Sequence, residues 1–418
     1  MRAPPGSRAA DGAGRETGEE EYWRKTGVDP ARARAFRRTT HPDAQWFGGA
    51  GLGLFVHWGI ASAHGGAELS WGAIDIGADE YFRLAECFDP ARYDPERWLR
   101  PAAEAGFRYA VLTARHHDGY ALWPSAVGSF GVRTHLGGRD LVQPFVDACR
   151  RCGIKVGLYY SPPDWYFNRS YTRFVTPDAP PMPPEHAERF RAYVREQLTE
   201  LLTRYGTIDL AWFDGGCDGA ITLEEIRRLQ PGIVINPRLF GVGDYITPEG
   251  VMLENRPRGW WEFCHTWNMP WFGYTEPVCY HSTGWVLTVL ARVRSWAGNF
   301  LLNCGPGPDG DMPPLYYERM AELAAWMRHS GVSVFGTRPC PSPASSNVYA
   351  TVRGSTWYLH AVPHVVENPV LRGVDRPARA VLLRTGDEVV VDWHDRRAEV
   401  KIPLQWRTEL DDVVAVSW

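Results

Sequence analysis

The chain has 418 residues, of which 44% are hydrophobic and 22% are charged, and its formal net charge is −4. This composition is typical of a globular chain that is large enough for one large core and a smaller second unit. The slight acidity gives no reason to expect nucleic acid or an anionic membrane as a partner. No apolar run has the length of a signal peptide or of a membrane span, so we expect a cytoplasmic protein.

Residues 1–40 are rich in Pro, Gly, Ala and charge, and we expect them to form a poorly ordered extension. Apolar runs that fit buried strands then alternate with segments that fit helices. The strand-like runs are 51–59, 107–119, 154–161, 209–214, 233–238 and 299–310. The helix-like segments are 95–106, 141–153, 184–205, 224–232 and 285–298. This order predicts an α/β fold with a (β/α)8-like barrel over residues 41–338.

The pattern changes after residue 338. Residues 348–418 consist of short alternating runs that are broken by Gly, Pro and Asp and have no helical period. Such runs are typical of antiparallel strands. We therefore predict a C-terminal antiparallel β-sandwich over residues 339–418.

Polar and aromatic groups recur where the predicted barrel strands end. Asp214 ends one strand and is followed by two glycines, which is how a barrel enzyme presents a catalytic carboxylate, although Asp-Gly is also common in turns. The other groups near strand ends are His57, Trp58, His116, His117, Tyr159, Tyr160 and Arg238. Because the carboxyl ends of barrel strands meet at one rim, we expect these side chains to share one pocket.

Such a pocket suits a sugar, which needs hydrogen-bond donors and acceptors beside apolar walls. Hydrolysis with retention requires two carboxylates, one that attacks the anomeric carbon and one that protonates the leaving oxygen. We expect Asp214 to be the nucleophile and either Glu249 or Glu262, both on loops of the same rim, to be the acid/base. The histidines lack the spacing and the carboxylate partner of a metal site, so no metal or other cofactor is expected.

Eight motifs between residues 46 and 337 resemble, in the same order, those of the α-L-fucosidases of glycoside hydrolase family 29. They are FVHWG (55–59), TARHHDGYALWPS (113–125), GLYYSPPDW (157–165), AWFDG (211–215), INPR (235–238), GDYITPE (243–249), WWEFCHTWN (260–268) and GNFLLNCGPGPDG (298–310). The resemblance implies an exo-acting retaining hydrolase that removes terminal α-L-fucose through a covalent ester on Asp214. It also implies a fucosylated oligosaccharide or glycoconjugate as the substrate.

The same resemblance implies which residues bind the sugar. They are His57, His116, His117, Tyr159 or Tyr160, Trp212 and Arg238. Members of the family place the acid/base either in a segment like GDYITPE or in one like WWEF, and both Glu249 and Glu262 are present here. We favour Glu249, because its segment closely follows Arg238, and Glu262 could instead orient Arg238 or a histidine.

The sequence departs from the family pattern after the first strand. Many members have an adjacent Glu and Trp that contact the sugar, whereas here two residues separate Glu68 from Trp71. Either side chain could still reach the sugar, or the contact could be lost. The alternative to an active fucosidase is a carbohydrate-binding relative that is non-catalytic or has another specificity. The chain is also compatible with a homo-oligomer.

Overall fold

The computed structural model describes residues 16–66, 76–341 and 344–418. Its larger part contains a seven-stranded sheet with the order β5-β4-β3-β2-β1-β7-β6, in which every neighbouring pair is parallel. The strands are β1 (Leu52–Val56), β2 (Tyr109–Arg115), β3 (Lys155–Tyr160), β4 (Leu210–Phe213), β5 (Val234–Ile235), β6 (Glu262–Thr266) and β7 (Asn299–Cys304). Nearly all of their residues are buried, as expected for a parallel sheet that is covered on both faces.

The sheet curls into a barrel, and the segment 244–250 lies between its two edge strands. The Asp244 backbone N–H donates to the Ile235 carbonyl of β5 at 2.8 Å. On its other side, Glu249 forms a parallel bridge to Cys264 of β6. The segment therefore takes the place of an eighth strand, and the predicted (β/α)8-like barrel is confirmed with seven regular strands.

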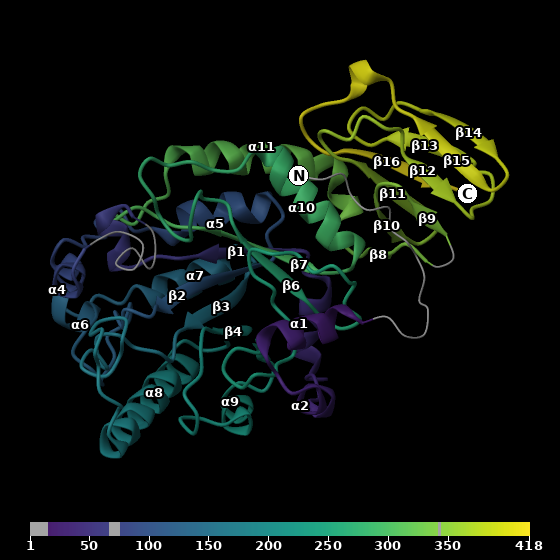
Figure 1. Ribbon diagram of the computed structural model, residues 1–418. Helices are drawn as coiled ribbons and strands as arrows, with labels where there is room; N and C mark the ends of the chain where they lie inside the picture. The colour runs from purple at the N-terminus through teal and green to yellow at the C-terminus, as the bar shows by residue number, and fades with distance from the viewer. Residues whose placement is uncertain (1–15, 67–75, 342–343) are drawn as a thin grey trace.

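Helices surround the barrel (Figure 1). They are α4 (Ala78–Arg83), α5 (Pro95–Glu104), α6 (Val132–His135), α7 (Val142–Arg151), α8 (Pro184–Arg204), α9 (Leu223–Leu229), α10 (Thr283–Ser295) and α11 (Pro314–Ser330). Side-chain caps fix where several of them begin: the Asp94 carboxylate accepts from the Glu96 backbone N–H, and the Ser282 hydroxyl accepts from the Trp285 backbone N–H. Among the described helices, none is both long and apolar enough to cross a membrane.

Short 3-10 helices complete the larger part. They are η1 (Pro42–Gly49), η2 (Ile60–His64), η3 (Leu84–Glu86) and η4 (Gly331–Ser333). The fully buried Phe47 of η1 packs against Tyr245 and Tyr109, with ring centroids 4.4 Å and 6.0 Å away. Tyr109 is the first residue of β2, so η1 closes the N-terminal end of the barrel and leaves the opposite rim for a site.

Two antiparallel sheets follow the barrel, with the orders β13-β16-β11-β10-β8 and β14-β15-β12-β9. Their strands are β8 (Arg338–Pro339), β9 (Ser345–Ser346), β10 (Tyr349–Arg353), β11 (Thr356–Ala361), β12 (Val370–Arg372), β13 (Arg379–Leu382), β14 (Val390–His394), β15 (Arg397–Lys401) and β16 (Asp412–Ser417), with η5 (Leu404–Trp406) before the last. They share a core of their own that includes Val352, Leu359, Val400 and Val414. The predicted sandwich is thus confirmed.

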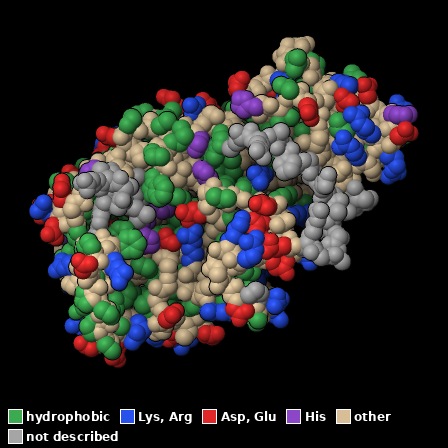
Figure 2. Space-filling model, viewed as in Figure 1, with side chains coloured by type: hydrophobic (Ala, Val, Ile, Leu, Met, Phe, Trp, Pro, Cys, Tyr) green, Lys and Arg blue, Asp and Glu red, His purple; other side chains and the backbone are tan. Residues whose placement is uncertain are grey.

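The sandwich packs against α10 and α11 of the barrel (Figure 1). Trp326 of α11 donates its indole N–H to the Asp411 carbonyl at 2.7 Å, and the Thr351 hydroxyl donates to the Ser333 carbonyl at 2.7 Å. On the face shown in Figure 2, acidic and basic side chains are interspersed. This mixture agrees with the small net charge.

The N-terminal region differs from its sequence-based expectation. Residues 1–15 lie outside the described residues, but 16–40 contain two helices, α1 (Gly18–Thr26) and α2 (Pro30–Ala35). Thr17 and Glu20 form a capping box at the start of α1. The Glu21 carboxylate then accepts hydrogen bonds from the backbone N–H groups of Glu254 and Asn255. These contacts with a distant loop hold α1 in place, and local composition cannot reveal them.

Candidate active site

Asp214 lies at the rim of the barrel, directly after β4. The Tyr159 hydroxyl donates to its Oδ2 at 2.9 Å, and Arg238 Nη1 donates to its Oδ1 at 2.8 Å. His117 Nε2 lies 3.5 Å from Oδ2. Gly215 has a φ of 95°, a conformation that favours glycine, so the chain turns away at once and leaves the carboxylate at the rim.

Several neighbours keep the Asp214 carboxylate ionised. Burial by itself would raise its pKa, because the charged form loses water. The Arg238 guanidinium, His117 and the Tyr159 hydroxyl outweigh this effect, so the pKa lies below its ordinary value. At neutral pH the side chain is therefore a carboxylate, the form that can attack an electrophilic carbon.

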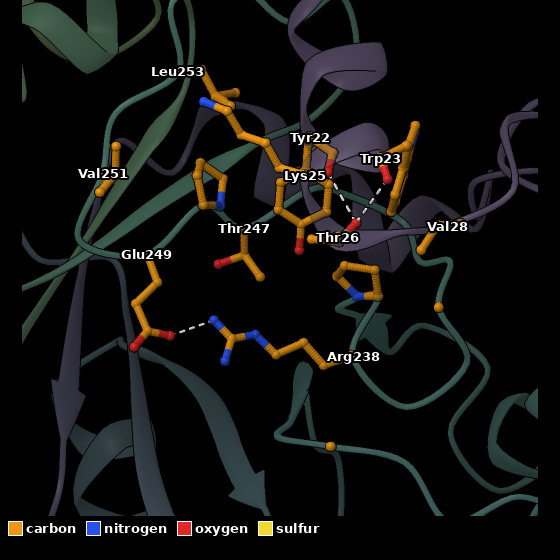
Figure 3. Close-up of a pocket in the computed structure, with 14 residues that line it drawn as sticks. Tyr22, Trp23, Lys25, Thr26, Val28, Arg238, Thr247, Glu249, Val251 and Leu253 are labelled. Carbon is orange, nitrogen blue, oxygen red and sulfur yellow. Dashed lines mark hydrogen bonds and ion pairs between the residues drawn. The ribbon is translucent and has the colours of Figure 1, made fainter.

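Arg238 connects Asp214 to a second carboxylate. While Nη1 donates to Asp214, Nη2 donates to Glu249 Oε2, a contact drawn in Figure 3. The guanidinium carbon also lies 4.5 Å from the centroid of the Trp212 ring. Because the guanidinium is a rigid planar fork, it fixes how the two carboxylates are placed relative to each other. The Glu249 side chain is 36% exposed and borders a cavity of about 510 Å³.

Glu262 lies elsewhere than the sequence predicts. It is the first residue of β6, not part of a rim loop, and it is fully buried inside the barrel. Three side chains donate to its carboxylate: the Tyr109 hydroxyl at 2.6 Å, the Trp212 indole N–H at 3.1 Å and the Thr247 hydroxyl at 3.2 Å. Burial raises the pKa of Glu262 to about 7 despite these donors. Glu262 therefore orients Trp212, whose ring in turn lies against Arg238.

Three histidines follow β1 and β2 at the same rim. The Asn303 amide donates to His57 Nδ1 at 2.6 Å, which leaves the ring proton on Nε2. Burial lowers the pKa of His57 to about 3 and also lowers the pKa values of His116 and His117. The His116 ring stacks on the Tyr159 ring with 5.4 Å between centroids. Neutral imidazoles can both donate to and accept from the hydroxyls of a ligand.

His116, His117 and Asp214 could together hold a metal ion, because one ligand atom from each lies within 4.8 Å of the others. However, the Arg238 guanidinium already places a positive charge 2.8 Å from Asp214. A metal ion on this carboxylate would be repelled by that charge. The group therefore suits a neutral polar ligand better than a cation.

Tyr160 is not part of this cluster. Adjacent residues of a strand point to opposite faces, and only Tyr159 points into the barrel. The Tyr160 hydroxyl donates to Gln197 of α8 at 3.0 Å, and the buried Arg115 guanidinium lies 4.2 Å from its ring centroid. Tyr160 thus connects β3 to the surrounding helices.

Trp58 also lies apart from the cluster. Its ring stacks on Tyr93 with 4.7 Å between centroids, and its indole N–H donates to the Gly307 carbonyl at 3.0 Å. It therefore contributes to the core behind His57. Glu68 and Trp71 lie outside the described residues.

Two residues near the histidines were not identified from the sequence. Asn303 is a polar residue in the otherwise buried, mostly apolar strand β7, and that contrast was a usable signal. The Phe272 ring lies 5.1 Å from the His57 ring and adds an apolar surface to the pocket. It comes from a stretch without periodicity, so no pattern pointed to it.

The chain is similar to α-L-fucosidases in sequence and in structure. The alpha-L-fucosidase family model matches residues 31–332. The tissue alpha-L-fucosidase of Bos taurus is 28% identical over 366 residues, which cover 76% of this chain and 75% of that protein. The α-L-fucosidase isoenzyme 1 from Paenibacillus thiaminolyticus is 30% identical with a TM-score of 0.77, over 90% of this chain and 98% of that one.

A further solved structure is a trapped covalent intermediate of an α-L-fucosidase from Bacteroides thetaiotaomicron, in complex with 2-fluoro-fucosyl fluoride. It is 25% identical with a TM-score of 0.76, over 91% of this chain and 97% of that one. Since the family model covers well over half of the sequence and solved relatives share both domains, the chain belongs to the α-L-fucosidase family of glycoside hydrolases.

Proposed function

We propose that this protein is a retaining exo-α-L-fucosidase, with Asp214 as the nucleophile and Glu249 as the acid/base. The observation that carries the proposal is the Arg238 guanidinium, which binds both carboxylates at once. Retention requires two carboxylates that act on the same sugar, one of them ionised in the resting enzyme. The lowered pKa of Asp214 fits that role, and the covalent intermediate of the Bacteroides relative supports the same two-step route.

In the first step, Asp214 attacks the anomeric carbon while Glu249 gives its proton to the glycosidic oxygen. The bond to the leaving group breaks, and a fucosyl ester forms on Asp214. In the second step, Glu249 takes a proton from water, the water oxygen attacks the anomeric carbon and the ester bond breaks. Negative charge thus passes from Asp214 to Glu249 and back, always beside the same Arg238. The guanidinium is never left without a counter-charge, which lowers the cost of moving the charge.

The remaining rim residues would bind the fucose ring. His57, His116 and His117 are neutral and can bind its hydroxyls, while Phe272 offers an apolar surface for its methyl group. Glu262 is assigned to orienting Trp212, since that ring separates it from Arg238 and the rim. The substrate class is a fucosylated oligosaccharide or glycoconjugate.

Replacement of Asp214 tests the nucleophile. With an aryl α-L-fucoside, Asp214→Gly should lose several orders of magnitude in kcat/KM, and azide should restore part of the rate while giving the inverted fucosyl azide. Asp218→Gly, an exposed Asp in the same loop, is the matched control and should behave like the wild type. Near-normal turnover by Asp214→Gly would refute the assignment. A wild-type protein that binds fucose but cleaves no fucoside would favour a non-catalytic binding protein.

A further inference from the structure

A cavity of about 510 Å³ lies beside the hydrogen bond between Arg238 and Glu249 (Figure 3). Helix α1 and Val28 form one wall, the segments 237–241 and 247–253 contribute others, and Gly215, next to Asp214, completes the lining. The volume lies within the range of about 300–1,000 Å³ that is typical of small-molecule sites. The cavity borders the acid/base but not the histidines, so the fucose site described above does not account for it.

We propose that this cavity holds the leaving-group sugar of the substrate, and that α1 supplies part of its binding surface. The proposal rests on the proposed function, because it places the leaving group next to Glu249. A proton can pass from Glu249 to the glycosidic oxygen only within hydrogen-bond distance of about 3 Å. The sugar attached to that oxygen must therefore lie beside Glu249, and the cavity provides open space there.

The side chains that α1 presents to the cavity suit a pyranose ring. Trp23 is an aromatic residue, partly buried, that contacts Tyr22 edge to face at 4.9 Å between centroids. Sugar rings pack their C–H faces on such aromatic rings while their hydroxyls need polar partners. Lys25 Nζ donates to Glu21 Oε1 at 2.6 Å, and an ammonium with three protons can make further bonds to hydroxyls. Val251 and Leu253 add apolar surface to the lining.

The wall formed by α1 is rigidly connected to the acid/base segment. The Glu21 carboxylate accepts hydrogen bonds from the backbone N–H groups of Glu254 and Asn255, which lie in the segment that follows Glu249. A sugar held against α1 would thus be held in a fixed position relative to Glu249. Helix α1 also precedes residue 31, where the match to the family model begins. This part of the subsite is therefore not among the residues that the family model matches.

Two substrates that share fucose but differ in leaving group test the proposal. One is α-L-fucosyl fluoride, whose leaving group is a single atom and cannot fill the cavity. The other is the best substrate from a panel of α-L-fucosyl disaccharides that differ in linkage. The measured quantity is the ratio of kcat/KM for the disaccharide to kcat/KM for the fluoride. For Trp23→Ala and Lys25→Ala this ratio should fall about tenfold, the size of one lost stacking or polar contact.

Arg24→Ala is the matched control, because Arg24 lies on the same helix but is 62% exposed and paired with Glu16. It should leave the ratio and both rates at wild-type values. An equal loss on both substrates for Trp23→Ala and Lys25→Ala would overturn the proposal, since α1 would then only support the catalytic centre. Wild-type rates on both substrates for these variants would also overturn it. So would a lowered ratio for Trp271→Ala alone, because Trp271, which is 47% exposed and neighbours Phe272, would then hold the sugar. If the wild type hydrolyses neither substrate, the proposed function itself fails.

Discussion

The charge on Arg238 should set the pH at which the enzyme becomes active. Replacing it with Gln keeps an amide at the position but removes the positive charge that Asp214 and Glu249 share. A hydrogen bond to a charged group contributes about 1.5–3 kcal/mol, and about 1.4 kcal/mol corresponds to one pKa unit. The Arg238→Gln change should therefore raise the pKa of Asp214 by about one to two units, because burial then acts with less opposition.

The direction of the effect follows from the form of Asp214 that reacts. In the proposed mechanism only the carboxylate form of Asp214 attacks, so kcat/KM should fall as the pH drops through the pKa of Asp214 in the free enzyme. With a raised pKa, the acid limb of the profile should move to higher pH by about one to two units. The assay is kcat/KM for an aryl α-L-fucoside across the acid and neutral range, with Arg24→Gln as the control. If Arg238→Gln lowers kcat/KM at every pH but leaves the acid limb of the profile at its wild-type pH, this account of Asp214 is refuted.

Three other changes separate residues that look alike in the sequence. Glu249→Ala should reduce kcat/KM by about 10²–10⁴-fold on fucosyl disaccharides but far less on fucosyl fluoride, because fluoride leaves without a proton. Equal losses of kcat/KM on the two substrates would exclude Glu249 as the acid. Tyr159→Phe should lower kcat/KM because Asp214 loses a hydrogen bond. Tyr160→Phe should instead lower the free energy of unfolding by about 1 kcal/mol and leave kcat/KM unchanged. A loss of kcat/KM with Tyr160→Phe but not with Tyr159→Phe would contradict the geometry. The pKa of Glu262 is raised from 4.5 to about 7, so the stability that its proton provides is lost as the pH rises through that range. Between about pH 5 and about pH 8, the free energy of unfolding measured with a denaturant should therefore fall by about 3 kcal/mol more for the wild type than for Glu262→Gln. If the free energy of unfolding changes with pH in the same way for both proteins, Glu262 is not buried in its protonated form.

The parts of the site that the sequence predicts are those that topology brings together. His57, His116, Asp214 and Arg238 each lie near the end of a strand-like run, and parallel strands carry such residues to one rim. Each run can be identified from its own apolar residues, so predicting these strands requires no information about distant contacts. The prediction that these groups share a site therefore follows from the order of the elements alone.

The parts that fail depend on distant partners. In the sequence Glu262 resembles a loop residue, because its strand is short and is flanked by Trp residues. In the structure the Tyr109 hydroxyl and the Trp212 indole N–H, from other strands, donate hydrogen bonds to its carboxylate inside the barrel. Alternation predicts that Tyr159 and Tyr160 point in opposite directions, but the choice between them depends on how β3 pairs with β4. Similarly, composition predicts disorder near α1, whereas Glu21 fastens that helix to a loop more than 200 residues away.

The segment 244–250 bonds to β6 through main-chain atoms, whereas it bonds to β5 through the Asp244 backbone N–H and through the Asp244 carboxylate, which accepts from the Ile235 backbone N–H at 2.9 Å. Main-chain hydrogen bonds do not depend on which side chains a segment carries, so residues 245–250 can vary while the barrel stays closed, provided that Asp244 is kept. Asp214 directly follows β4, which pairs with β3 along its whole length, and this pairing does not involve residues 245–250. Substitutions in residues 245–250 should therefore be able to move or replace the proposed proton donor Glu249 while the proposed nucleophile Asp214 keeps its position at the end of β4.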